Sequence, residues 1–76
     1  MKKDCWVEKI DSSGKGICIH HSDYISEALK FVKNYDLNKG DKLIIWQNFV
    51  GKVFSRTSDG SGIIINKYYD YLLAGR

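Results

Sequence analysis

The sequence predicts a single α+β domain over residues 1–76, in which a small antiparallel sheet packs on one main helix and the elements follow the order ββαβββ. Three observations support this fold class. The chain has 76 residues, of which 43% are hydrophobic, so it can bury one small core. One stretch, residues 22–36, repeats its apolar residues at three- and four-residue steps, as a helix does. Two stretches that flank it share the frame S-x-G-x-G-I-x-I, which is typical of hairpin turns.

The first hairpin is predicted over residues 5–21. CWVEKID alternates imperfectly and leads into SSGKG, whose two glycines can adopt the positive φ angles of a tight turn. In the return strand GICIHH, we expect Ile17 and Ile19 on one face and Cys18 and His20 on the other. The repeat of this frame over residues 53–65 has two explanations, which are a shared need for turn residues and an internal duplication.

The main helix is predicted to begin at Ser22, a favourable N-cap, with Asp23 in the first turn where the helix dipole favours a carboxylate. Gly40 in the turn LNKGD ends the helical region. The apolar face of the helix consists of Ile25, Ala28, Leu29, Val32 and Tyr35. The solvent-exposed face consists of Ser26, Glu27, Lys30, Lys33 and Asn34.

Three antiparallel strands are predicted after the helix. Residues 43–46 are apolar without alternation, which indicates a central strand that is covered on both faces. Residues 52–57 form the next strand, and the turn SDGSG leads into the last one, IIIN. The tail KYYDYLLAGR suits a short closing helix, with Asn66 as its cap and Gly75 at its end.

The charge of the chain permits a polyanionic partner without requiring one. The net charge is +3, and lysines outnumber arginines ten to two. Because arginine dominates the reading of base edges, this ratio disfavours sequence-specific DNA readout. The glycine turns, with Lys15 in the first, could bind an anion through their amide groups, but neither turn leads into a helix as nucleotide-binding loops do.

The cysteines and histidines do not define a catalytic or metal site. We expect Cys5 and Cys18 to be buried, reduced thiols of a cytoplasmic protein, because the N-terminus has no apolar run of signal-peptide length. Cys18, His20 and His21, with Cys5 across the hairpin, offer atoms that zinc could bind, but their spacing matches no known ligand pattern. The sequence predicts neither an enzyme, nor a cofactor, nor a bound metal. It also has no apolar run long enough to span a membrane.

The chain has more aromatic residues than one thin core can bury. Trp46 and Phe54 are expected in the core, whereas Trp6, Phe49 and Tyr71 are predicted to form a partner interface. Chains of this size often gain apolar burial by pairing, so a homodimer is expected.

The region from Val7 to about Phe54 contains the frame V-E-K-I-D-S-S-G-K-G-I-C-I, then a helix, then D-L-N-K-G-D-K-L-I-I. In this order it resembles the AbrB/SpoVT family of swapped-hairpin DNA-binding domains. The resemblance implies an intertwined dimer that meets DNA phosphates through its basic turns, with Lys9 and Lys15 as contacts by position. Lys30 and Lys33 on the helix are further candidates. From residue 23 onward, the element order is also similar to that of a double-stranded-RNA-binding domain.

Two functions follow as expectations. The first is a small dimeric DNA-binding transcriptional regulator that contacts phosphates through its basic hairpin turns. The alternative is a protein-interaction module, such as a small phage or mobile-element inhibitor of anti-defence or anti-CRISPR type that binds a host protein complex.

Overall fold

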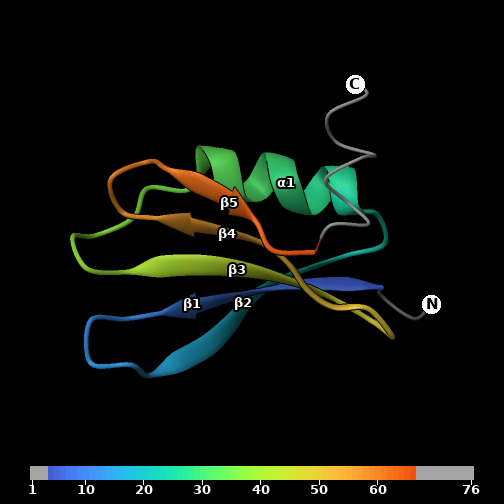
Figure 1. The fold of residues 1–76 in the computed structure, drawn as a ribbon, viewed down its shortest axis with the longest axis horizontal. Coiled ribbons are helices and arrows are strands. Elements are labelled where there is room, and N and C mark those ends of the chain that lie inside the picture. Colours follow the sequence, from blue (N-terminus) through green and yellow to red (C-terminus); the bar gives the residue numbers. More distant parts are fainter. Residues whose placement is uncertain (1–3, 67–76) are drawn as a thin grey trace.

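The computed structural model describes residues 4–66. These residues form a five-stranded antiparallel sheet and one helix, in the predicted order ββαβββ (Figure 1). The predicted closing helix and Tyr71 lie outside the described residues. The elements are β1 (Cys5–Ile10), β2 (Gly16–Ser22), α1 (Ile25–Asn34), β3 (Lys42–Gln47), β4 (Gly51–Thr57) and β5 (Gly62–Ile64).

The strand order in the sheet is β2-β1-β3-β4-β5. The predicted first hairpin, β1–β2, and the three strands after the helix are therefore both present. The sheet becomes continuous because β1 also pairs with β3, from Cys5 opposite Gln47 to Ile10 opposite Lys42. This pairing leaves β2 and β5 at the two edges.

The N-cap of helix α1 lies two residues later than predicted, at Tyr24. Ser22 is not its N-cap but the last residue of β2, where it pairs with Cys5 and is buried. The ladder with β1 therefore keeps the chain extended up to Tyr24, which is the N-cap with φ −128° and ψ 143°. The hydroxyl of Ser22 donates to the carbonyl oxygen of Tyr24 at 3.2 Å, so it still fixes the entry to the helix.

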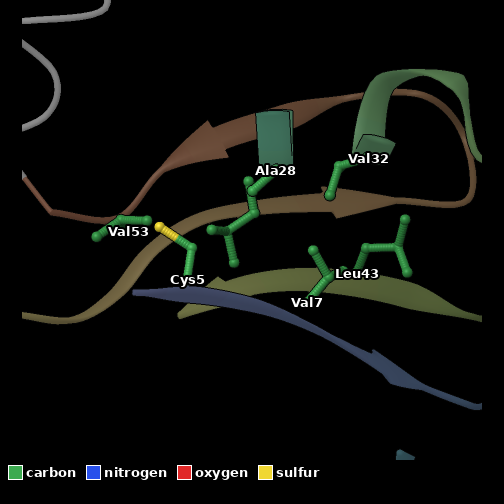
Figure 2. Packing of buried hydrophobic residues seen from close by; sticks show 7 residues of the cluster. Cys5, Val7, Ala28, Val32, Leu43 and Val53 are labelled. Atoms are coloured by element: carbon green, nitrogen blue, oxygen red, sulfur yellow. The ribbon is translucent and has the colours of Figure 1, made fainter. Parts of the chain in front are cut away.

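The core lies between α1 and one face of the sheet. Figure 2 shows the side chains of Ala28 and Val32 directed toward strands β1 and β3. Strand β3 lies in the middle of the sheet, as predicted, and its residues Leu43, Ile44 and Ile45 are all buried. The buried cluster consists of Cys5, Val7, Ala28, Val32, Leu43, Ile45 and Val53.

The repeated sequence frame forms the same backbone turn twice. In the first turn, the Asp11 N–H donates to the Lys15 carbonyl and the Gly14 N–H donates to the Asp11 carbonyl, both at 2.9 Å. The second turn repeats both bonds with Thr57, Gly60 and Ser61. Gly14 and its counterpart have φ of 92° and 91°, a region that favours glycine.

In each turn one carboxylate accepts hydrogen bonds from the turn. This carboxylate belongs to Asp11, at the start of the first turn, and to Asp59, inside the second turn. In the first turn, Asp11 Oδ1 accepts bonds from the N–H groups of Ser13 and Lys15, both at 3.0 Å. In the second, Asp59 Oδ1 accepts from the Ser61 N–H at 2.9 Å. The shared requirement is thus an acceptor inside the turn, which supports common turn chemistry as the explanation of the repeat.

Stability at acid pH is expected to depend on Asp59. Hydrogen bonds from the Thr57 hydroxyl and from Ser61 lower the pKa of Asp59 from 3.8 to about 2. A lowered pKa means that the folded state prefers the carboxylate, so the stabilisation is full above pH 3.8 and is lost as the pH falls toward 2. In urea unfolding between pH 5 and 2, the free energy of unfolding should therefore fall less steeply with decreasing pH for Asp59→Asn than for the wild type. Equal slopes for the wild type and Asp59→Asn would contradict this expectation.

Candidate functional site

The face of the sheet opposite α1, which we call the open face, carries rows of side chains that pair across neighbouring strands. Since directly opposed residues share a face, the register of the strands defines these rows. The row nearest the β3–β4 turn is His21, Trp6, Trp46 and Lys52. The next row is Cys18, Glu8, Ile44, Ser55 and Ile63.

A tryptophan pair occupies the middle of the first row. The rings of Trp6 and Trp46 stack with centroids 6.3 Å apart and an interplanar angle of 6°. Trp46 Nε1 donates to Glu8 Oε1 at 3.0 Å, and Lys52 Nζ lies 5.3 Å from the Trp46 ring centroid. The prediction that Trp46 belongs to the core is wrong, because it is half-buried on the open face. Phe54 does pack against the core, as predicted.

The turn between β3 and β4 lies at the lower right of Figure 1. Phe49 belongs to this turn, at the tip of the hairpin. Its side chain is 101% exposed relative to the reference state, and it is the only non-glycine residue in 4–66 with a positive φ, 65°. A side chain with a Cβ costs about 1–2 kcal/mol in this left-handed region. The neighbouring Val50 is also exposed. The tip therefore presents apolar surface on a strained backbone.

The backbone of this tip is held in place from both sides. The Val50 N–H donates to the Gln47 carbonyl at 3.2 Å and closes the turn. The Asn48 N–H donates to the Asp4 carbonyl at 3.0 Å, and the Gln47 side-chain amide donates to the Asp4 carboxylate. Because these bonds attach the turn to Asp4, the residue before β1, the backbone that carries Phe49 is held in place.

The four lysines predicted to contact DNA lie on two separate parts of the domain. Lys15 is exposed in the β1–β2 turn and Lys9 is half-buried on β1, whereas Lys30 and Lys33 are exposed on α1. Residues 4–66 carry seven lysines, one arginine and eight acidic residues, so the described domain has no net charge. The net positive charge of the chain comes from residues outside this range. DNA contact by these lysines stays a prediction.

A groove of about 440 Å³ lies between edge strand β2 and helix α1. The ring of His20 stacks on Phe31 with centroids 4.1 Å apart and an interplanar angle of 8°. Phe31 in turn contacts Tyr35 at 5.5 Å between centroids. Glu27 and Lys30 also line the groove. This stack connects the edge strand to the helix.

A β-bulge in β2 changes which side chains of that strand lie together. Val7 pairs with His20 and Glu8 pairs with Cys18, so Ile19 is an extra residue on β2. The alternation shifts by one residue, and Cys18 shares the open face with His21 instead of with His20 as predicted. Cys18 Sγ lies 3.6 Å from His21 Nε2 and 3.9 Å from His21 Nδ1.

The two thiols lie in opposite environments. Both are free, and Cys5 is buried as predicted, but Cys18 is exposed because it faces away from the core on an edge strand. Burial, and next the charge of Asp4, raises the pKa of Cys5 to about 11, so this thiol is unreactive near neutral pH. Within residues 4–66, no group of three or more potential ligands is arranged to hold a metal ion.

Comparison of the chain with protein-family models, with curated proteins and with solved structures finds no match in any of the three. The resemblance to swapped-hairpin domains therefore stays a prediction. No helix among the described residues has both the length and the apolar composition needed to cross a membrane.

Proposed function

We propose that the protein is a protein-interaction module that docks on a folded partner protein by inserting Phe49 into an apolar pocket. The observation that carries this proposal is the combination of full exposure and a left-handed backbone at Phe49. The unbound domain pays both for the strain and for the exposed ring. Burying a phenylalanine side chain contributes about 1.5–3 kcal/mol, so a partner's pocket would offset both costs.

The surroundings of Phe49 suit an interface of this type. The stacked Trp6 and Trp46 lie on the adjoining end of the open face, and interface centres are enriched in such aromatic residues. Glu8 and Lys52 flank the tryptophans and provide a polar rim. Because the hairpin tip is attached to Asp4, little conformational freedom is lost when it binds.

The chemistry of the surface favours a protein over a polyanion or a lipid surface. The net charge of the whole chain is only +3, and the four candidate lysines lie on two separate parts of the domain, whereas phosphate binding depends on clustered positive charge. One phenylalanine with one valine is far less apolar surface than the amphipathic stripe of a membrane-bound helix. Inhibition of a host complex, the alternative function expected from the sequence, requires a partner surface of this kind.

The test replaces Phe49 by glycine, which removes the aromatic ring and can adopt the positive φ of this position without strain. The free energy of unfolding should rise by up to about 1 kcal/mol as the strain is relieved, while affinity for the partner should fall about 30-fold, as expected for a central aromatic anchor. Phe49→Asn should weaken binding similarly, because asparagine also tolerates a positive φ. The partner is identified by photo-crosslinking from a benzoylphenylalanine at position 49, and affinities are then measured with the purified partner.

Tyr24→Ser is the matched control, since Tyr24 is 66% exposed and has an ordinary backbone conformation. It should leave partner affinity unchanged, and a crosslinker at position 24 should not capture the same protein. Unchanged affinity for both Phe49 variants would refute the proposal. Salt-dependent binding of duplex DNA that survives Phe49→Gly would instead support the regulator predicted from the sequence.

A further inference from the structure

We infer that Cys18 and His21 form half of a zinc site, and that a second copy of the chain completes this site when the two β2 strands pair. The site lies on the exposed side of an edge strand and does not involve the hairpin tip of the proposed function. It is a new assignment, because neither the spacing in the sequence nor any group of three ligands within residues 4–66 indicates a metal.

The separation of the two side chains is the first argument. Zinc binds thiolate sulfur at about 2.3 Å and imidazole nitrogen at about 2.1 Å with tetrahedral geometry, which places such a sulfur and nitrogen about 3.6 Å apart. Cys18 Sγ and His21 Nε2 are 3.6 Å apart. Both side chains are exposed, so a metal can reach them without any rearrangement of the backbone.

The β-bulge is the second argument. In a regular strand, residues three apart point to opposite faces, and Cys18 and His21 could not act on one ion. The extra residue Ile19 brings them onto the same face. Bulges cost regular pairing and are often found where a strand must redirect a side chain for function.

The edge position of β2 is the third argument, and it identifies the source of the missing ligands. A structural zinc ion takes four protein ligands, and this chain offers two here. Strand β2, with the sequence GICIHHS, has neither a proline nor a lysine or carboxylate to protect its edge, although bare edges invite pairing. The other edge strand, β5, has only three residues.

Antiparallel pairing of two β2 strands about a twofold axis between residues 19 and 20 sets Cys18 opposite His21 of the second copy. Opposed residues in such a pair have Cβ atoms about 4.5–5.5 Å apart, so two thiolates and two imidazoles meet on the open face. The four ligands form a Cys₂His₂ set. Each Cys18 thiol releases its proton to solvent on binding, so one zinc ion displaces two protons and binding weakens in acid.

Metal-free protein is titrated with Zn²⁺ at pH 7 in the presence of a non-chelating reductant. Calorimetry gives the number of zinc ions bound per chain, and light scattering gives the mass of the protein before and after zinc is added. We expect one zinc ion per two chains and conversion of monomer to dimer. Co²⁺ as a probe should give the sulfur charge-transfer and intense visible bands of tetrahedral thiolate coordination. Cys18→Ser and His21→Asn should each weaken binding at least 100-fold while keeping the wild-type urea midpoint.

His20→Asn is the matched control, because His20 lies on the other face of the same strand and should leave zinc affinity unchanged within threefold. Phe49→Gly should also bind zinc normally, which separates this inference from the proposed function. The inference is overturned by an absence of micromolar binding, by one zinc ion per monomer without dimerisation, or by equal losses in the Cys18 and His20 variants.

Discussion

Replacing Leu43 by alanine is expected to lower the free energy of unfolding by about 3 kcal/mol. Leu43 is fully buried and lies in the cluster between α1 and the sheet. Leucine-to-alanine changes at such sites remove transfer free energy and leave a cavity, with a combined cost of about 2–5 kcal/mol. A domain of this size has a total stability of roughly 4–11 kcal/mol, so a large part of it depends on this one side chain.

Urea unfolding followed by tryptophan fluorescence measures this loss. Ile63→Ala is the control, because Ile63 also lies in the sheet but is 59% exposed, and it should change stability by less than about 0.5 kcal/mol. A Leu43→Ala protein as stable as the control variant would show that the cluster in Figure 2 is not the stabilising core.

Local chemistry in the sequence was sufficient to predict the order of the elements. The frame S-x-G-x-G selects a hairpin turn through its first glycine, Gly14 or Gly60, which the structure places at positive φ; the second glycine of each frame does not adopt this angle. The unbroken apolar run at residues 43–46 identified the central strand, since Leu43, Ile44 and Ile45 are all buried. The helix start was wrong, because capping preferences carry no information about a strand that continues through Ser22 by pairing with Cys5.

Pairing between distant strands cannot be predicted from local sequence patterns. The placement of β1 beside β3 depends on contacts across more than thirty residues, and it puts Trp6 opposite Trp46 on the open face. A composition argument that sends large aromatic residues to the core cannot detect such a pair. For the same reason the bulge at Ile19 was missed, because it exists only relative to the register of β1.

The sequence predicts the properties of the candidate anchor Phe49 only in part. Phe49 was predicted as an interface residue from the excess of aromatic residues, and the structure shows it fully exposed. Its backbone strain was not predicted. In the turn Asn48-Phe49-Val50, asparagine tolerates a positive φ far better than phenylalanine, so residue preferences would assign the unusual angle to the wrong position.

The second large effect is expected at Arg56, whose replacement by methionine should cost about 2–3 kcal/mol. Arg56 Nη1 donates to the carbonyl oxygens of Val32 and Tyr35, both at 2.6 Å. The Val32 carbonyl also accepts the Tyr35 N–H, at the long distance of 3.4 Å. Carbonyl groups at a helix C-terminus fall outside the regular helical ladder, and a positive charge there is favoured by the helix dipole. Hydrogen bonds from a charged donor contribute about 1.5–3 kcal/mol, so these two attach the end of α1 to β4.

Unfolding in urea gives the total loss in the free energy of unfolding. Amide hydrogen exchange shows which part of the fold is destabilised: the amides in the last turn of α1 should exchange faster in Arg56→Met, with less change in β3. The stability of Arg56→Lys should lie between that of the wild type and that of Arg56→Met, because an ammonium group is charged but lacks the planar fork of donors of a guanidinium group. Lys33→Met, on the exposed side of the same helix turn, is the control and should cost less than about 0.5 kcal/mol. A stable Arg56→Met protein with unchanged exchange would contradict this role.

The position of Arg56 also bears on the choice between the two functions. It is the only arginine in residues 4–66, and its guanidinium is directed to the helix end instead of to solvent. The described domain thus uses internally the one side chain best suited to bidentate phosphate contact. The other cationic side chains of residues 4–66 are seven lysines, and the same residues carry eight acidic side chains. This distribution supports an aromatic protein anchor over a phosphate-binding surface as the functional feature of the fold.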